Sequence, residues 1–292
     1  MNQPPRSTET GSGGRDDFPA WRRPPGVARG TWRYCQERSI ADRYDDFVAD
    51  TPLCELDLRW IQSELFGSLT PGNSTGRPAR VIDFGCGTGR ATNLLTARGV
   101  DVVAVDLSRD MLRHVRRSHI AQRLAASKED RHEPGQLLPV QANLVQLDAI
   151  ASQCMDAGVC LLSTYGMIQG RENRIAFLGH ARRILCVGGK LLLHVHHRWA
   201  ALCEPGGTRA LARNAIQAMW HRDHEFGDTT YAYRGLPDMF LHRSSRRSLA
   251  QELREAGWDP VTMQDISIDG TKKISQAWLQ MAGGFFVTAT AS

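Results

Sequence analysis

The pattern of apolar and polar positions changes early in the chain. The first thirty residues are rich in Pro, Gly, Ser and Arg and have almost no apolar periodicity. Such a segment buries too little surface to offset the entropy lost on ordering, which predicts a disordered tail over residues 1–30. Apolar residues then recur at three- and four-residue spacing, for example at Ile40, Tyr44 and Phe47. This spacing predicts a helical cap within residues 31–79, closed by a Gly/Pro/Ser-rich loop.

Beyond residue 79, short apolar runs alternate with helical patterns. Five runs predict strands over residues 80–84, 101–105, 137–141, 158–163 and 190–196. Because these runs are almost continuously apolar, they favour parallel strands covered by helices on both faces. Two further runs, over residues 261–268 and 285–291, suit closing strands. The predicted fold class is therefore α/β, with a doubly wound, mostly parallel, seven-stranded sheet.

Residues 197–243 interrupt this alternation and predict an insertion after the fifth strand. The segment is rich in Trp, His, Arg and Gly, with residues such as Trp220, Tyr231, Tyr233 and Arg234. These side chains could stack on a planar substrate or on an RNA base. They could equally form the small core of a lid, which is the interpretation we favour. The predicted main domain spans residues 80–292 and includes this insertion.

Composition is that of an ordinary globular protein. Apolar residues make up 41% and charged residues 23% of the 292 residues. No apolar run approaches the ~18 residues that a membrane-spanning helix needs, and the N-terminal sequence lacks the apolar stretch of a secretory signal. Seven scattered cysteines without a Cys-x-x-Cys pair disfavour a disulfide framework and a zinc ribbon. We therefore expect a cytoplasmic protein without a membrane partner.

The basic excess is mild and dispersed. Lys and Arg number 36 against 31 Asp and Glu, which gives a net charge of +5. The tail has five arginines against three acids, and the insertion has six against five. A nucleic-acid footprint needs basic residues concentrated on one face, so this distribution makes nucleic acid an unlikely partner.

A glycine-rich turn follows the first predicted strand, in the run Val81–Arg90 (VIDFGCGTGR). Glycines allow the backbone to approach a ligand closely. The dinucleotide fingerprint has glycines at its first, third and sixth positions, whereas here they occupy the first, third and fifth, and Arg90 is the sixth. Asp83, before the turn, suits an ammonium group better than a pyrophosphate. Asp106 ends the second strand, where a carboxylate can hold a ribose diol.

These motifs together resemble the class I S-adenosylmethionine-dependent methyltransferases over roughly residues 35–292. Asp83 and the three glycines match the family's cofactor loop, Asp106 matches its ribose-binding acid, and Asn143 stands where the family usually has an Asp that accepts from the adenine amino group. The resemblance implies a Rossmann-like fold and S-adenosyl-L-methionine as cofactor. The cofactor-binding residues that it implies are Tyr44, Asp83, Gly85, Cys86, Gly87, Gly89, Asp106, Leu107, Met111, Asn143, Leu144 and Ser163.

Further segments add to the resemblance. Leu161–Met167 is similar to the family's fourth-strand segment beneath the cofactor, Arg183–Gly189 to its Arg-x-Leu-x-Pro-Gly-Gly turn, and Ala41–Asp45 to the Tyr-Asp segment that often folds over the cofactor. Taken singly, the glycine loop could serve another nucleotide, and Asp106 could cap a helix. Their order on successive strand ends favours the cofactor site.

Candidate catalytic residues follow the fifth strand. His196 and His197 lie where substrate should bind, on opposite faces of the strand by alternation, and either could act as a general base. They could instead form a strand-end cluster bonded to backbone, or join His221 and His224 around zinc, although acids and cysteines at ligand spacing are missing. Tyr165 is a third candidate, as a substrate contact or as an aromatic packed under the adenine. We predict no metal site.

The leading hypothesis is a methyltransferase with a small-molecule acceptor. The alternatives are an RNA or protein methyltransferase, and a cofactor-binding module that acts through partners without catalysis. Ser163-Thr-Tyr-Gly166 stands where amino-group DNA and protein-glutamine methyltransferases have Asn-Pro-Pro-Tyr, which argues against those branches. The sequence leaves the acceptor atom and the oligomeric state open.

Overall fold

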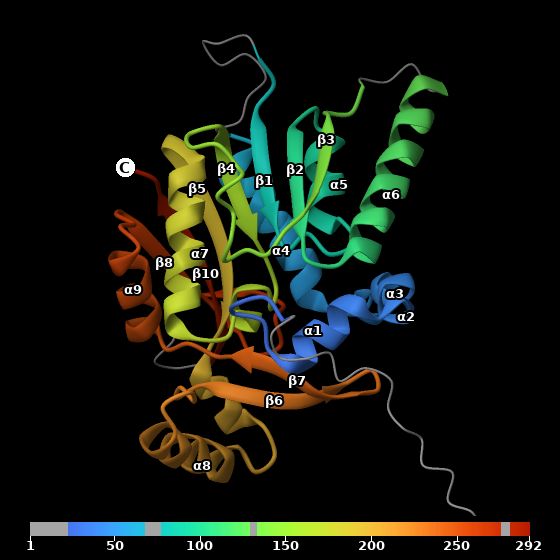
Figure 1. Cartoon of the computed structure of the whole chain (residues 1–292). Helices are drawn as coiled ribbons and strands as arrows, with labels where there is room; N and C mark the ends of the chain where they lie inside the picture. Colours follow the sequence, from blue (N-terminus) through green and yellow to red (C-terminus); the bar gives the residue numbers. More distant parts are fainter. Residues whose placement is uncertain (1–22, 68–76, 129–132, 276–280) are drawn as a thin grey trace, which may run out of the picture.

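The computed structural model describes residues 23–67, 77–128, 133–275 and 281–292. The main sheet within these ranges has eight strands in the order β3-β2-β1-β4-β5-β10-β8-β9 (Figure 1). These strands are β1 (Arg80–Phe84), β2 (Asp101–Asp106), β3 (Leu137–Gln141), β4 (Met155–Cys160), β5 (Leu185–His196), β8 (Val261–Ser267), β9 (Lys273–Ile274) and β10 (Ala282–Thr290).

The sheet is parallel from β3 to β5 and antiparallel beyond β5. The predicted α/β, Rossmann-like class with a mostly parallel sheet is therefore confirmed. The predicted strand number of seven is one short, because the two-residue strand β9 pairs with β8 through Asp265 and Ile274. So short a strand leaves no periodic signal in the sequence.

Helices cover both faces of the sheet. The helices are α1 (Arg29–Gln36), α2 (Arg38–Asp42), α3 (Tyr44–Val48), α4 (Pro52–Leu65), α5 (Arg90–Thr96), α6 (Arg109–Lys128), α7 (Arg171–Ile184), α8 (Gly207–Trp220) and α9 (Arg246–Glu255). Alternate residues of β1 explain the two layers: Ile82 and Phe84 pack with α7 and α9, whereas Val81 packs with α4 and α5. None of the helices in the described ranges is long and apolar enough to cross a membrane.

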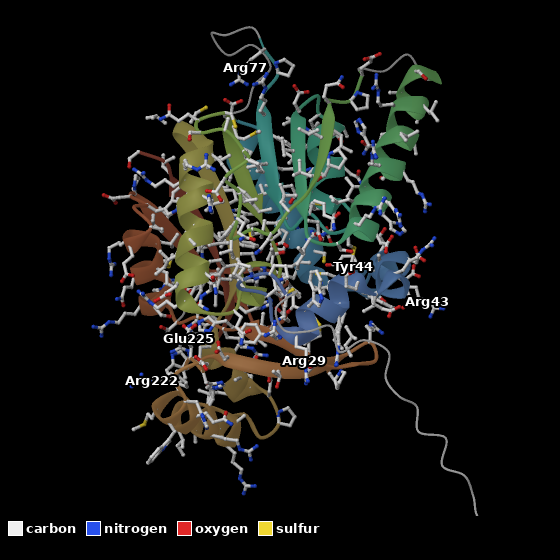
Figure 2. The ribbon with its side chains drawn as sticks, viewed as in Figure 1. Arg29, Arg43, Tyr44, Arg77, Arg222 and Glu225 are labelled. Atoms are coloured by element: carbon white, nitrogen blue, oxygen red, sulfur yellow. The ribbon has the colours of Figure 1, made fainter. Side chains whose placement is uncertain are left out.

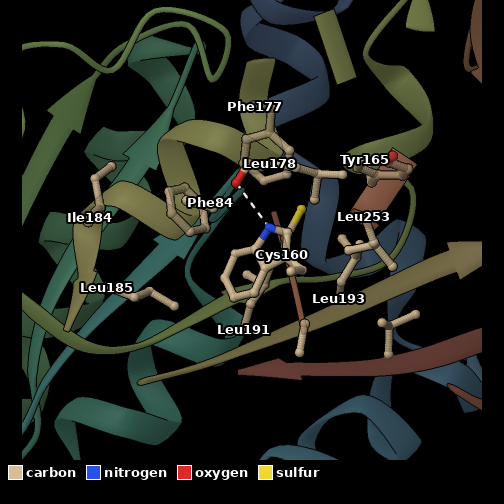
Figure 3. Close-up of a cluster of buried hydrophobic side chains, with 14 of the residues drawn as sticks. Phe84, Cys160, Tyr165, Phe177, Leu178, Ile184, Leu185, Leu191, Leu193 and Leu253 are labelled. Carbon is tan, nitrogen blue, oxygen red and sulfur yellow. Dashed lines mark hydrogen bonds between the residues drawn. The ribbon is translucent and has the colours of Figure 1, made fainter. Parts of the chain in front are cut away.

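The larger core cluster lies between β4, β5, α7 and α9 (Figure 3). Phe84 packs edge-on against Phe177, with ring centroids 5.3 Å apart. The buried indole of Trp258 donates a hydrogen bond to the Leu178 carbonyl at 3.1 Å, the dashed line in Figure 3. This core fixes the ends of β1, β4 and β5, where the predicted functional residues lie.

The helical cap begins earlier than residue 31. Residues 1–22 of the predicted tail lie outside the described residues, but Val27 is buried, forms a β-bridge with Ile168, and precedes the start of α1 at Arg29. The tail prediction therefore extends too far for residues 23–30. A run of Pro, Gly and Arg gave no periodic signal, although its backbone packs against the main domain.

Residues 197–243 form a unit beside the main sheet. They comprise the 3-10 helix η3 (Arg198–Cys203), α8, and a separate hairpin of β6 (Asp228–Tyr233) and β7 (Leu236–His242). The hairpin packs on α1, and Figure 1 shows it passing beneath the cap at the lower end of the sheet. The cap and the hairpin thus meet on the side where the parallel strands end.

Candidate functional site

A cavity of about 320 Å³ lies at the carboxyl ends of β1, β2, β4 and β5. Eleven of the twelve predicted cofactor-binding residues line it, and Gly89 is the exception. A Cβ on Gly89 would lie 3.1 Å from the Val115 side chain of α6, and its φ of +97° is left-handed. Gly89 therefore serves the close packing of α5 on α6 rather than the cavity wall.

The glycine loop is held against the end of β2. The backbone N–H groups of Gly85 and Cys86 both donate to the Val105 carbonyl, at 2.8 and 3.0 Å. Gly85 has a φ of +70°, and a Cβ there would lie 2.3 Å from the Thr164 side chain. Only glycine fits this position without displacing Thr164.

Asp106 connects this loop to β2. Its Oδ2 accepts from the Gly87 N–H at 2.9 Å, and its Oδ1 accepts from the Ser108 N–H at 2.7 Å. Burial raises the pKa of Asp106, and the backbone N–H bonds oppose that rise. The carboxylate lines the cavity with lone pairs still able to accept from a ligand hydroxyl.

Asp83 lies beneath the loop. Its side chain is buried, and its Oδ2 accepts from the Thr92 hydroxyl at 2.7 Å. Burial raises its pKa to about 6, against the lowering effects of Thr92 and the nearby Arg90 guanidinium. A cationic ligand in the cavity would stabilise the ionised carboxylate.

Arg90 is paired within the protein. Its guanidinium donates to the Cys54 carbonyl and, at 3.1 Å, to Oδ2 of the fully buried Asp57. Burial raises the pKa of Asp57 to about 7 even beside this arginine. Among the described residues that line the cavity, the formal charges are thus Asp83, Asp106 and Arg90, whose guanidinium is paired with Asp57. This balance suits a ligand that carries positive charge.

Asn143 lines the cavity, but both ends of its amide are already bonded. Its Nδ2 donates to the Pro25 carbonyl at 2.9 Å, and its Oδ1 accepts from the Val145 N–H at 3.3 Å. The side chain therefore ties the segment before α1 to the edge of the cavity. An adenine amino group would have to share Oδ1 with Val145.

Of the three predicted catalytic residues, only His196 lines the cavity. Its Nε2 lies 3.0 Å from the Ser163 hydroxyl, and burial lowers its pKa to about 4, so the ring is neutral at physiological pH. His194 precedes His196 on the same face of β5, and the centroids of the two imidazole rings are 5.0 Å apart. His197 faces the other way, packs edge-on against Phe285 with ring centroids 4.7 Å apart, and does not line this cavity.

Tyr165 is a core residue. It is fully buried in the cluster of Figure 3 and does not line the cavity, and its hydroxyl donates to the buried Glu252. Glu252 also accepts from the guanidinium of Arg174, with Nη2 at 2.8 Å from Oε1. Tyr165 therefore supports the packing of α7 and α9 rather than contacting a substrate.

Four tyrosines from two distant segments line the cavity. The sequence predicted Tyr44 as a cofactor contact and left Tyr231 and Tyr233 open between stacking on a substrate and forming a lid core, whereas Tyr34 was not predicted. Tyr34 belongs to the cap, and Tyr231 and Tyr233 belong to β6. Ring centroids are 6.2 Å apart for Tyr34 and Tyr233, and 6.3 Å for Tyr231 and Tyr233. Tyr231 and Tyr233 are two residues apart, and on a strand this spacing puts both rings on one face. The sequence could therefore have predicted that the two rings act together. Their partner Tyr34 could not be known without the packing of α1 on the hairpin.

Tyr44 covers the glycine loop. A Cβ placed on Gly87 would lie 3.7 Å from its ring, and the neighbouring Asp45 accepts a hydrogen bond from the Thr88 hydroxyl at 2.5 Å. Figure 2 shows Tyr44 where the cap meets the main domain. The cap is thereby fastened directly to the loop.

The histidine-based zinc alternative finds no support in the described part of the chain. The one group there with metal-ligand spacing is Glu225, Asp228 and His242, at the base of the insertion. Glu225 is already paired with the guanidinium of Arg174 at 2.6 Å, and Asp228 with His242 at 2.7 Å. A divalent cation would have to displace that arginine.

Comparison with known proteins identifies relatives for most of the chain. A family model described as "Methyltransferase domain" matches residues 59–263. The "Putative methyltransferase YqeM" of Bacillus subtilis is 24% identical over 184 residues. That match covers 63% of this chain and 65% of the relative, slightly less than two thirds of its length.

Solved structures share the fold at low identity. The CcbJ methyltransferase from Streptomyces caelestis is 18% identical with a TM-score of 0.58, over 87% of this chain and 96% of its own. An S-adenosylmethionine-dependent methyltransferase from Methanosarcina mazei is 15% identical with a TM-score of 0.55, over 72% and 92%. The glycopeptide N-methyltransferase MtfA, solved with S-adenosyl-L-methionine, is 17% identical with a TM-score of 0.52, over 81% and 93%.

Proposed function

Because this chain belongs to the family of S-adenosylmethionine-dependent methyltransferases, we propose that it methylates a small-molecule acceptor bound in the cavity at the strand ends. The observation that carries this proposal is that two segments outside the main sheet, the cap and the hairpin, both form walls of the cavity. The cap supplies Tyr34 and Tyr44, the hairpin supplies Tyr231 and Tyr233, and the two segments pack on each other. A concave cavity of about 320 Å³ with such walls suits a small molecule better than a folded polymer.

The cavity residues suit the family's cofactor. S-adenosyl-L-methionine supplies a methyl group on a positively charged sulfur and also carries an ammonium group. Asp83 and Asp106 give the cavity a negative balance that complements those charges. We assign Asp106 to the ribose hydroxyls, Asp83 to the region of the ammonium group, and Gly85 and Gly87 to close backbone contact.

The acceptor end of the cavity is aromatic and uncharged. Tyr231 and Tyr233 offer flat apolar faces, and the neutral His196 ring lines the same cavity with a nitrogen that can bond to an acceptor hydroxyl or amine. We assign His196 the task of orienting that group, with its own ring positioned by Ser163. Methyl transfer depends chiefly on such positioning, which supplies up to about 7–11 kcal/mol of the barrier reduction.

A macromolecular acceptor is less favoured. The insertion carries six arginines against five acids, which is not the concentrated basic surface that a nucleic acid needs. The MtfA neighbour is a glycopeptide N-methyltransferase, and an acceptor of that modest size is compatible with the cavity. The similarity to MtfA supports a shared fold and gives no evidence for a shared acceptor.

A transfer screen tests the proposal. Purified protein is incubated with methyl-labelled S-adenosyl-L-methionine and, in parallel, a small-molecule metabolite extract, bulk tRNA and total protein. We expect label in the metabolite extract, and much less there with Asp106→Ala when the cofactor is below saturation. Label in tRNA or protein alone would contradict the small-molecule acceptor. Cofactor binding without transfer to any pool would instead favour the non-catalytic module.

A further inference from the structure

Helix α6 carries a concentration of positive charge. Its 20 residues include six Lys and Arg and one acid, Asp110, which gives the helix a net charge of +5. The net charge of the whole chain is also +5, so the charges of all other residues sum to zero. Figure 1 shows α6 at the right-hand edge of the molecule, beyond the edge strand β3. The basic excess of this protein is therefore carried by one helix at the edge of the fold.

The arginines of α6 form a row on its outer face. Arg109, Arg113 and Arg116 follow one another at spacings of four and three residues, and Arg123 continues the row two turns later. All four side chains are exposed, as is that of the adjacent Arg117. At 1.5 Å per residue, the row is about 21 Å long. It is therefore a straight positive surface and not a single charged spot.

Few acids of the protein neutralise this row. Asp110 pairs with Arg113, and the strongly exposed Glu133 lies 3.9 Å from the guanidinium of Arg123. Among the residues that the structure describes, no acid lies within 4.0 Å of the other three guanidinium groups. Most of the positive charge on the row is therefore available to an anionic partner.

Two exposed aliphatic side chains lie within the same row. Ile120 is 58% exposed and follows Arg116 by four residues, and Leu124 is 59% exposed and follows Ile120 by four. Residues at this spacing share one side of a helix, so the aliphatic groups and the arginines face the same partner. Arg123 lies directly beside Leu124 in the sequence. The surface thus offers apolar contact and positive charge together.

This combination complements a bilayer surface that contains anionic phospholipids. Arginine side chains have long apolar stems, so their guanidinium groups can stay among the lipid phosphates while neighbouring aliphatic groups enter the apolar layer beneath. A nucleic-acid backbone offers the negative charge without an apolar layer, and Ile120 and Leu124 would then lie against phosphate groups. These two exposed side chains therefore favour a lipid surface over a nucleic acid.

We propose that α6 binds the surface of a bilayer containing anionic phospholipids, with its arginines among the headgroups and Ile120 and Leu124 inserted between them. Such binding needs no membrane-spanning helix, and none is found among the described residues. A basic residue near an anionic surface changes the partition coefficient about fivefold, and salt weakens that contribution. The proposal goes beyond the methylation reaction and does not depend on it.

Cosedimentation of the full chain with vesicles tests the proposal. We expect binding to phosphatidylglycerol vesicles, little binding to phosphatidylcholine vesicles, and release at high salt. The double variant Arg109→Gln/Arg116→Gln should lower the partition coefficient for phosphatidylglycerol about twentyfold. The matched control, Arg247→Gln/Arg254→Gln, removes two exposed arginines from α9 at the opposite edge of the molecule (Figure 1) and should bind like wild type. Both double variants lower the net charge equally, so a difference between them locates the contact on α6.

A second double variant tests the insertion of the aliphatic groups. Ile120→Ala/Leu124→Ala should weaken binding to phosphatidylglycerol vesicles about fivefold or more, because it removes apolar surface that enters the bilayer. Vesicle binding that this variant leaves unchanged, or equal binding by the two arginine variants, would overturn the proposal. So would a chain that binds bulk tRNA or polyglutamate but binds phosphatidylglycerol vesicles no more tightly than phosphatidylcholine vesicles, because the row would then serve a soluble polyanion.

Discussion

The backbone of Gly30 lies directly against the carbonyl of Asp238, so that a Cβ on Gly30 would lie 1.9 Å from that oxygen. The two residues join α1 to β7 across more than two hundred positions of the sequence. The Asp238 side chain adds a hydrogen bond from the Arg29 guanidinium at 2.8 Å. This joint sets Tyr34 of the cap beside Tyr233 of the hairpin.

Gly30→Ala should open the joint between cap and hairpin. The added methyl group cannot be placed without moving backbone, and overpacking of this kind costs about 1–3 kcal/mol. We expect a lower melting temperature and faster hydrogen exchange in α1 and β7. Gly179→Ala, on α7 with open space around it, is the control and should be neutral or stabilising. Wild-type exchange rates in Gly30→Ala would contradict the close contact.

Asp106→Ala should weaken cofactor binding. The change removes a carboxylate that organises Gly87 and is assigned to the ribose, and hydrogen bonds to charged groups contribute about 1.5–3 kcal/mol. We expect a loss of affinity of roughly tenfold or more by isothermal titration calorimetry. Asp110→Ala, which removes an acid paired with Arg113 on the surface of α6, should bind like wild type.

Cofactor affinity should fall as pH decreases through 6. In the free protein the pKa of Asp83 is about 6, above the usual carboxyl value, because the group is buried. Below pH 6 the Asp83 carboxyl is mostly protonated and no longer attracts a cation. At pH 7 it is mostly ionised and can attract the positively charged cofactor. Titration calorimetry between pH 5 and pH 8 measures this dependence. In Asp83→Asn the decrease between pH 7 and pH 5 should be smaller than in wild type.

The raised pKa of Asp83 has the opposite effect on the stability of the cofactor-free protein. A carboxyl with a folded pKa above its unfolded pKa of about 4 binds more protons in the folded state between these values. The free energy of unfolding therefore decreases as pH rises from 4 through 6, and Asp57, with a pKa of about 7, extends that decrease. Denaturant unfolding of Asp83→Asn should show a smaller decrease than wild type over this range.

His196→Ala should lower kcat with little change in cofactor affinity. The side chain contacts Ser163 at the acceptor end, and we expect a decrease of about tenfold to a hundredfold once an acceptor is known. Because the pKa of His196 is lowered to about 4, its ring should contribute no activity change between pH 6 and pH 9. His197→Ala, on the opposite face, is the control and should keep near wild-type turnover. Equal turnover in His196→Ala and His197→Ala would remove His196 from the site.

Glu252→Ala should destabilise the whole chain. Arg174 is fully buried between Glu252 and Glu225, and removing one partner of a buried ion pair costs about 3–5 kcal/mol. Glu255→Ala removes the exposed pair with Arg171, which should contribute little because water and salt screen it. Thermal unfolding compares the two variants. Melting temperatures lowered by the same amount would contradict the structural role of the buried pair.

The parallel strands were predictable because each is a short, almost continuous apolar run. Their bounds moved by a few residues, as in β4, which was predicted over residues 158–163 and spans Met155–Cys160. The glycine loop and Asp106 were also predictable, since their spacing is local and each lies where a strand ends. Cavity-lining positions of this kind are set by the strand itself and need little knowledge of distant packing.

Residues whose roles depend on distant partners were placed less well. The partner of Tyr165 is Glu252, 87 positions away, and a buried acid on α9 could not be assigned to it from the sequence. Asn143 is likewise bonded to Pro25, 118 positions away, in a segment whose composition indicated disorder. Tyr34 joined the cavity only through the packing of α1 on the hairpin. In each case tertiary packing decided the role.

The contact between Gly30 and Asp238 also affects how fast a ligand can enter and leave the cavity. Its ion pair is exposed at Arg29, and it holds together two segments that lie outside the main sheet. Separating them leaves the β-ladders and both large cores intact, so this opening costs less free energy than global unfolding. Ligand entry and product departure would then proceed at the rate of a local opening of α1 from β7, which makes turnover sensitive to residues that never touch the reacting atoms.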